Sequence, residues 1–161
     1  MHKQDDWYVR SYFEYQDTLR NGGYVQAITL TYNETSLPLY TKFKLPGFSR
    51  EHIQNFLKLV RDKVGSNLRF FMSCEYGDEK HRPHYHFLFY CPPTIDRHEL
   101  LKAIARSWHH GIIYATDIND GLIIDVRGIR YVSKYCVKDL LQNEWFLQQR
   151  QRLKQLCEVR D

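Results

Sequence analysis

The chain has 161 residues, of which 43% are hydrophobic and 15% are aromatic. This length is typical of one domain, and this composition excludes a disordered chain. The longest uncharged apolar run, residues 87–91, is far shorter than the roughly 20 residues of a membrane-spanning helix, so we expect no membrane association. Residues 1–6 are polar with no apolar stretch behind them, which indicates no secretory signal and a protein that stays in the cytoplasm.

The net charge of +4 is modest but unevenly distributed. Residues 41–70 carry seven basic and two acidic side chains, and residues 127–161 carry eight and four. The segments 1–40 and 71–126 are net acidic. Two basic segments around an acidic, histidine-rich middle favour contact with a polyanion around a site that itself holds a cation, although an ordinary solvated surface gives the same pattern.

Periodicity and punctuation residues predict three elements in the first 65 residues. The N-terminal residues 1–23 contain a helix over residues 7–20, and β-branched and aromatic residues predict a strand over residues 24–32. After a loop with two prolines, Ser49 is a candidate N-cap of a helix that stops at Gly65.

The middle of the chain predicts a hairpin, and the remainder predicts helices around two short strands. Strands over residues 68–75 and 84–91 are joined by a turn-rich loop. A capping box at Asp96 and Glu99 opens a helix that ends near Gly111. Two further strands over residues 112–118 and 122–126 surround an Asn-Asp-Gly turn, and residues 127–159 are helical in two pieces. The predicted fold class is α+β, with helices on one face of an antiparallel sheet of about five strands.

His84 and His86 are two residues apart on the predicted second hairpin strand. Side chains alternate along a strand, so both imidazoles project from the same face, roughly 6.5–7 Å apart along the chain. Two such rings can turn toward one metal ion, but two solvated histidines on a partly exposed strand are the alternative.

Glu75 ends the partner strand of the same hairpin. If it pairs opposite His84, or opposite His86 with a slightly longer loop, its carboxylate lies on the face of the two imidazoles. Two neutral imidazoles and one carboxylate leave positions open for a phosphate oxygen, and such a site suits a divalent cation acting as a Lewis acid. A Glu–His surface pair is the alternative.

A second group of candidate residues falls on the helix predicted after residue 127. Tyr131, Lys134, Tyr135 and Lys138 follow helical spacing and form one stripe, with Ile129 and Val132 on the opposite, buried side. Tyrosine is a poor nucleophile at its ordinary pKa near 10, and a neighbouring ammonium with a polarised phosphodiester would let the phenolate attack. Without a metal site, the stripe would be an amphipathic helix whose tyrosines cover the core edge.

Taken together, a carboxylate strand, a His-hydrophobic-His strand and a helix with Tyr-x-x-Lys resemble the HUH endonucleases, which nick single-stranded DNA through a tyrosine. Residues 74–77 (Cys-Glu-Tyr-Gly), 82–86 (Arg-Pro-His-Tyr-His) and 131–135 (Tyr-Val-Ser-Lys-Tyr) are similar to the rolling-circle replication initiators of the microvirus class of small single-stranded DNA phages. Residues 29–32 resemble the first motif of that family. The similarity spans a motif-bearing core of about residues 24–139, which leaves 140–161 as a C-terminal helix.

The resemblance implies a role for each matched residue. Glu75, His84 and His86 would hold Mg²⁺ or Mn²⁺. Tyr131 would be the nucleophile, with Lys134 as its lysine. Tyr135 and Lys138 would form a second, overlapping pair that alternates with the first, and the spacing does not decide which tyrosine is primary.

The resemblance also implies an activity and a fold. A single HUH endonuclease domain, 1–161, built on a palm similar to RNA-recognition modules, would nick and join single-stranded DNA at a replication origin through a 5′-phosphotyrosine. It would thereby initiate rolling-circle replication in the cytoplasm of a bacterial host. No Gly-x-x-x-x-Gly-Lys-Ser/Thr stretch occurs in the 161 residues, so a host helicase and polymerase would be partners.

The basic candidates for the DNA backbone are Lys42, Lys44, Arg82, Arg127 and Arg130. Tyr32, Tyr40, Phe43 and Phe48 could stack on bases, or they could be ordinary loop and core aromatics. Three rival functions remain: a transposase or relaxase with the same chemistry, a non-catalytic module that binds single-stranded nucleic acid, and a non-haem iron oxygenase with the same ligand set.

Overall fold

The central element of the fold is an antiparallel sheet with strand order β4-β5-β1-β6. The computed structural model describes residues 3–40, 45–77, 80–115, 119–135 and 144–158. Its strands are β1 (Tyr24–Leu30), β2 (Leu39–Tyr40), β3 (Leu45–Pro46), β4 (Arg69–Tyr76), β5 (Pro83–Cys91) and β6 (Ile113–Tyr114), and β2 and β3 pair separately. Its helices are α1 (Lys3–Arg20), α2 (Arg50–Val64), α3 (Arg97–Ser107), α4 (Val126–Tyr135) and α5 (Glu144–Glu158). The α+β class and the antiparallel sheet are confirmed.

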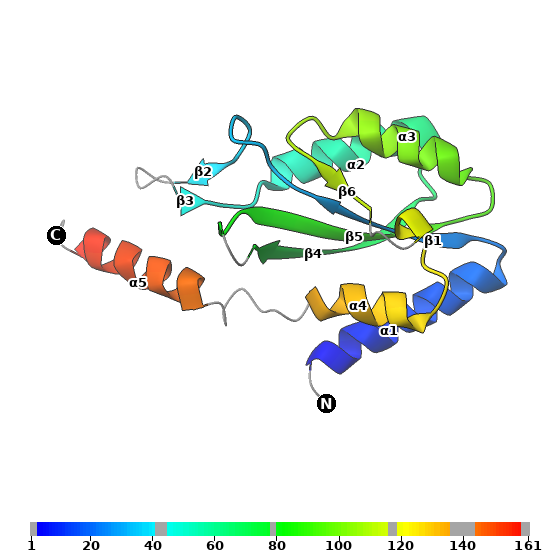
Figure 1. The fold of residues 1–161 in the computed structure, drawn as a ribbon, viewed down its shortest axis with the longest axis horizontal. Helices are drawn as coiled ribbons and strands as arrows, with labels where there is room; N and C mark the ends of the chain where they lie inside the picture. The colour runs from blue at the N-terminus through cyan, green and yellow to red at the C-terminus, as the bar shows by residue number, and fades with distance from the viewer. Residues whose placement is uncertain (1–2, 41–44, 78–79, 116–118, 136–143, 159–161) are drawn as a thin grey trace.

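Helices α2 and α3 cover one face of this sheet (Figure 1). Alternate residues of β5, namely Tyr85, Phe87 and Phe89, are buried in the core on this side. Phe56 of α2 packs edge-on against Phe87, with ring centroids 5.7 Å apart. The cap predictions for both helices are confirmed, because the side chain of Ser49 accepts from the N–H of His52 and that of Asp96 accepts from the N–H of Glu99.

Helices α1 and α4 cover the opposite face (Figure 1). Leu88 and Tyr90, the β5 residues that alternate with those just named, are buried in a second core with Tyr15 of α1 and Ile129 of α4. The prediction that helices cover only one face is therefore wrong. The physical reason is that β5 is apolar on both sides, and both faces of such a strand need cover from water.

The strand predicted over residues 122–126 is also absent. Only one isolated bridge, between Gln26 and Leu122, forms there, and α4 begins at Val126. Asn119, Asp120 and Gly121 all have positive φ, which turns the chain too sharply for a ladder to extend. The strand predicted over 112–118 is reduced to β6, with residues 116–118 outside the described part of the chain.

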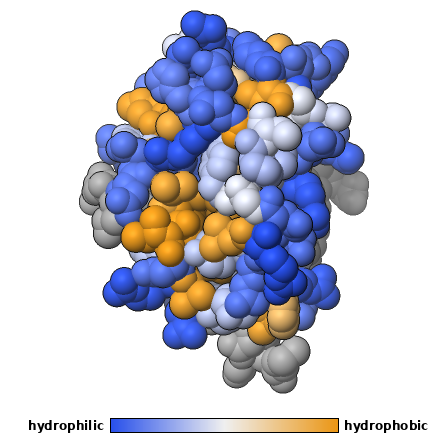
Figure 2. Space-filling view, turned by 90° about the vertical axis from the view of Figure 1, so that its right-hand side faces the viewer, coloured by the Kyte–Doolittle hydropathy of each residue, from blue (hydrophilic) through white to orange (hydrophobic). Residues whose placement is uncertain are grey.

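The outer surface is mostly hydrophilic at the end of the molecule that Figure 2 faces, with a few hydrophobic areas near its centre. Among the described helices, none has the length and apolarity required to cross a membrane. Helix α5 confirms the predicted second helical piece at the C-terminal end. Near its start, the indole of Trp145 lies against the imidazole of His81, with ring centroids 4.4 Å apart.

Candidate metal centre

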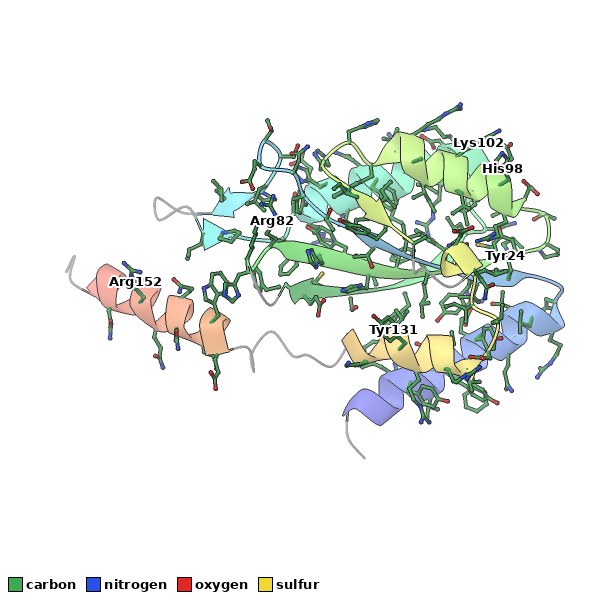
Figure 3. The ribbon with its side chains drawn as sticks, in the orientation of Figure 1. Tyr24, Arg82, His98, Lys102, Tyr131 and Arg152 are labelled. Atoms are coloured by element: carbon green, nitrogen blue, oxygen red, sulfur yellow. The ribbon has the colours of Figure 1, made fainter. Side chains whose placement is uncertain are left out.

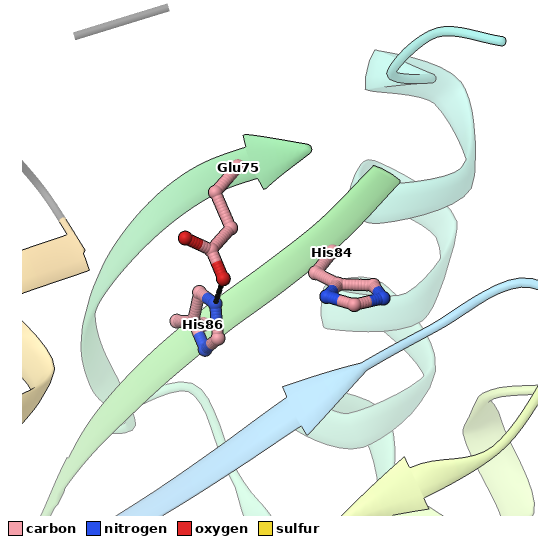
Figure 4. A group of neighbouring side chains, drawn as sticks. All are labelled: Glu75, His84 and His86. Carbon is pink, nitrogen blue, oxygen red and sulfur yellow. Dashed lines mark hydrogen bonds and ion pairs between the residues drawn. The ribbon is translucent and has the colours of Figure 1, made fainter. Parts of the chain in front are cut away.

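The β4–β5 hairpin brings Glu75, His84 and His86 together on one face of the sheet (Figure 4). Glu75 pairs directly opposite His84, and Ser73 pairs opposite His86, which is the first of the two registers considered from the sequence. Because side chains two residues apart share a face, this register places all three groups on the same side.

The three candidate ligands converge closely. One ligand atom from each residue lies within 4.8 Å of those of the other two. The shortest approach is 3.0 Å, between Nε2 of His86 and Oε1 of Glu75. Glu75 and His86 are buried, and His84 is partly exposed, so the cluster opens toward solvent on the His84 side.

The surroundings of His84 favour a neutral ring. Burial is the main cause that lowers the pKa of His84, and the neighbouring His86 lowers it further. Neutral imidazole is the form that offers a lone pair to a metal. Gly77, at the end of β4, leaves room for this ring, since a Cβ at that position would lie 3.1 Å from Cε1 of His84.

Thr29 is a contact of the site that sequence reasoning missed. It lies on β1 opposite His86, and its hydroxyl oxygen is 2.9 Å from Nδ1 of His86. The one sequence signal for it is a hydroxyl residue between the apolar Ile28 and Leu30. The register between β1 and β5, which are more than fifty residues apart, is what makes the contact, and no local pattern encodes it.

The donor set fits a divalent metal ion. Two imidazole nitrogens and one carboxylate oxygen supply three ligands with a single negative charge, and further coordination positions stay available for oxygen ligands. A buried carboxylate beside two imidazoles is costly unless it is paired or bound to a metal, so the arrangement is one that a cation would stabilise.

Helix α4 packs on the same face of the sheet as this triad. His84 and His86 alternate along β5 with residues of the α2 side and share their face with Leu88, which packs in one core with Ile129 and Val132 of α4. The predicted buried side of the helix, as far as it is described, is thus confirmed. Tyr131 is 52% exposed on α4, below the sheet in Figure 3, and Lys134 is also exposed. The Tyr135 side chain and Lys138 lie outside the described residues.

The described basic candidates each have a partner within the chain. Arg82 forms an ion pair with Glu34 and donates to the carbonyl oxygen of Tyr32 at 2.8 Å. Arg127 donates to the Asp125 carboxylate at 2.7 Å. The guanidinium of Arg130 lies 5.0 Å from the centre of the Tyr8 ring. Lys42 and Lys44 lie outside the described residues.

Two of the aromatic candidates belong to the core rather than to an exposed stacking surface. Tyr32 is 4% exposed and packs against Trp108, with ring centroids 5.3 Å apart. Phe48 is partly buried against Tyr76, at 4.8 Å. Burial of these apolar rings under α2 and α3 explains why they do not present their faces to solvent. Phe43 and the Tyr40 side chain lie outside the described residues.

Comparison with known proteins gives a family. Residues 25–140 match the family model of the replication-associated protein ORF2. A curated relative, the replication-associated protein ORF2 of Spiroplasma virus 4, is 27% identical over 150 residues, which cover 84% of this chain and 44% of the relative, so the chain spans less than half of that relative's length. No solved structure matches the chain significantly. Because the family model covers well over half of the 161 residues, the chain belongs to the replication-associated protein ORF2 family.

Proposed function

We propose that this domain is a metal-dependent endonuclease of the HUH type, which nicks and joins single-stranded DNA at a replication origin through a 5′-phosphotyrosine. In this role it would initiate rolling-circle replication, as in the microvirus class of phages. The observation that carries the proposal is the convergence of Glu75, His84 and His86 on the sheet face against which α4 packs. Membership in a replication-associated family supports it.

Glu75, His84 and His86 would hold the metal, and Mn²⁺ or Mg²⁺ is the proposed ion. When bound there, a divalent cation supplies Lewis acidity that withdraws charge from the scissile phosphate. The protein contributes the geometry of the site. The β4–β5 register fixes the carboxylate opposite His84, and the paired strands hold all three ligands on rigid elements.

Tyr131 or Tyr135 is the proposed nucleophile. The phenol oxygen attacks phosphorus, the bond from phosphorus to the 3′ oxygen breaks, and the departing 3′ oxygen takes up a proton while the phenol loses one. Lys134 lies one turn from Tyr131 and would stabilise the phenolate and the charge that develops on the phosphate. Because the number of phosphoester bonds is unchanged, the 3′ hydroxyl can reverse the step, and cutting and joining use one site. Lys138 would have the same role beside Tyr135.

The proposed partners follow from this activity. Single-stranded origin DNA would be bound along its backbone by basic side chains such as Arg127 and Arg130, both exposed on α4, and by Lys42, Lys44 and Arg82. A host helicase and polymerase would unwind and extend the DNA in the bacterial cytoplasm. In this arrangement the domain cuts, while the motor activity comes from another protein.

The test is mass spectrometry of the intact protein after incubation with single-stranded origin DNA and Mn²⁺. The wild type is expected to gain the mass of the 5′ fragment, on Tyr131 or Tyr135. Tyr131→Phe and Tyr135→Phe together should abolish the adduct. Tyr114→Phe is the matched control, since Tyr114 is 54% exposed but lies on β6. An adduct that persists in the double variant, or cleavage undiminished in EDTA, contradicts the proposal.

A non-catalytic nucleic-acid-binding module is the rival that this experiment separates. Such a module binds DNA in EDTA as well as in Mn²⁺, and it forms no covalent product. The metal-ligand geometry at Glu75, His84 and His86 favours the enzyme, because a binding module has no need of a buried carboxylate among imidazoles.

A further inference from the structure

Both nitrogens of the His86 ring have a defined neighbour. Nε2 lies 3.0 Å from Oε1 of Glu75, and Nδ1 lies 2.9 Å from the hydroxyl oxygen of Thr29 on β1. A rotation of the ring would lose both contacts. We infer that Thr29 is a positioning residue, whose hydroxyl holds His86 in the tautomer that presents the lone pair of Nε2 to a divalent cation. This inference rests on the metal site of the proposed function.

The hydroxyl suits this role because it can act in both directions. Without a metal, Nε2–H can donate to the Glu75 carboxylate, while the Thr29 hydroxyl donates to the lone pair on Nδ1. For Nε2 to act as a ligand, the ring must carry its proton on Nδ1, and Nδ1–H then needs an acceptor. The Thr29 oxygen is that acceptor, and a hydroxyl reaches this state by rotating its hydrogen. The same contact therefore serves the ring in both states.

Strand formation does not account for a hydroxyl at this position. Thr29 lies between Ile28, which is 3% exposed, and Leu30, which is fully buried, in a strand otherwise suited to β-branched side chains. Valine has the shape of threonine and an equal tendency to form strands. What valine lacks is the hydrogen bond to His86. Partners of metal-bound histidines of this kind typically change metal affinity by 10–100-fold.

The first experiment measures Mn²⁺ affinity from the electron paramagnetic resonance signal of unbound Mn²⁺. Thr29→Val is expected to bind Mn²⁺ about 10–100-fold more weakly than the wild type, and Thr29→Ser is expected to retain most of the affinity. Thr31→Val is the matched control, because the Thr31 hydroxyl bonds to the carbonyl of Ile112 instead of to the triad. It should bind like the wild type.

The second experiment observes the ring directly in the wild type, so it does not depend on any variant folding. Zn²⁺ serves as a diamagnetic probe, and ¹⁵N chemical shifts of the His86 side chain report which nitrogen carries the proton. The expected spectrum has the proton on Nδ1 and the metal on Nε2. A proton on Nε2 in the loaded protein overturns the inference.

The affinity outcomes separate this inference from the proposed function. Wild-type protein that binds Mn²⁺ while Thr29→Val binds it equally well overturns the role of Thr29 alone. Serine as weak as valine also overturns it, because the hydroxyl would then not be the cause. Wild-type protein that binds no Mn²⁺ overturns both the inference and the metal site itself.

Discussion

The hydroxyl groups of Tyr32 and Tyr85 lie 2.9 Å apart in the core beneath α2, on the opposite face of the sheet from the metal ligands. Tyr85 stands between His84 and His86 on β5, and its oxygen also accepts from the N–H of Ser49 at 2.7 Å. These bonds connect the strand that carries the two histidines to the start of α2. The contact thus fixes β5 from behind, at the point where its other face holds the site.

Removal of the Tyr85 hydroxyl should destabilise the protein. Tyr85 is 1% exposed, so Tyr85→Phe would remove a buried acceptor for Ser49 and a partner of Tyr32, at a cost of about 1–3 kcal/mol in the free energy of unfolding. Urea denaturation of the metal-free protein measures it. Tyr114→Phe, at a position that is 54% exposed, should change the free energy of unfolding by less than about 0.5 kcal/mol. Equal effects of the two substitutions would contradict the buried role of the Tyr85 hydroxyl.

Stability should fall at acid pH through His110. Its ring stacks on that of His52 at 3.9 Å, and burial, followed by the charges of His52 and His109, lowers its pKa. The unfolded chain, with an ordinary histidine pKa near 6.5, therefore binds a proton at a higher pH than the folded protein. In the interval below about 6.5 and above the lowered folded value, the free energy of unfolding decreases as the pH falls.

The variant His110→Gln should reduce this decrease. Denaturation curves in EDTA at a series of pH values between about 5 and 8 would show a smaller pH slope for His110→Gln than for the wild type. His98→Gln is the control, because His98 is exposed on α3. A slope unchanged in His110→Gln, or reduced equally by His98→Gln, would show that the stacked pair is not the titrating element.

The sequence predicted the metal-ligand hairpin because local rules determine it. Alternation along a strand puts His84 and His86 on one face, and a short loop restricts the register of Glu75 to two choices. The contact of Thr29 with His86 obeys no such rule, because it depends on the pairing of strands distant in the sequence. The same limit applies to the cover of both faces of the sheet: an apolar strand shows that it is buried, but not which helices bury it.

The failure at residues 122–126 has a different cause, which is turn geometry. The alternating apolar residues there suggest a strand, but the preceding Asn119–Gly121 segment turns the chain toward α4. The Gln26 side chain donates to the carbonyl of Asp120 at 2.7 Å, and Arg97 donates to the same carbonyl at 3.1 Å. Two side chains from β1 and α3 therefore hold the turn, and this long-range support overrides the local strand pattern.

Substitution of Gly121 should test how tightly this turn is held. Gly121 has φ +80°, and a Cβ there would lie 2.3 Å from the carbonyl oxygen of Ala27. Gly121→Ala therefore combines backbone strain of about 1–2 kcal/mol with a clash against β1. Gly65→Ala is the matched control, since Gly65 also has positive φ but has nothing within 4 Å of the added Cβ. In urea denaturation Gly121→Ala should be the more destabilised variant, and equal losses would mean that strain alone acts.

Binding of Mn²⁺ should stabilise the fold through Glu75. An ion that binds only the folded state raises the free energy of unfolding by about 2.7 kcal/mol when its concentration is 100 times the dissociation constant. Thermal unfolding with and without Mn²⁺ should therefore show a higher midpoint in the wild type. The isosteric Glu75→Gln removes the single negative charge of the ligand set, so most of this increase should be lost. EDTA should return the wild type to its metal-free midpoint.

The control for this effect is Glu99→Gln, because the Glu99 side chain is 61% exposed on α3 and forms its ion pair with Lys102. It removes the same charge from the protein as Glu75→Gln, so general electrostatic attraction of Mn²⁺ is reduced equally in both variants. Only direct coordination distinguishes them. The midpoint increase should therefore persist in Glu99→Gln, and an increase that survives in Glu75→Gln as well would mean that the ion binds elsewhere on the chain.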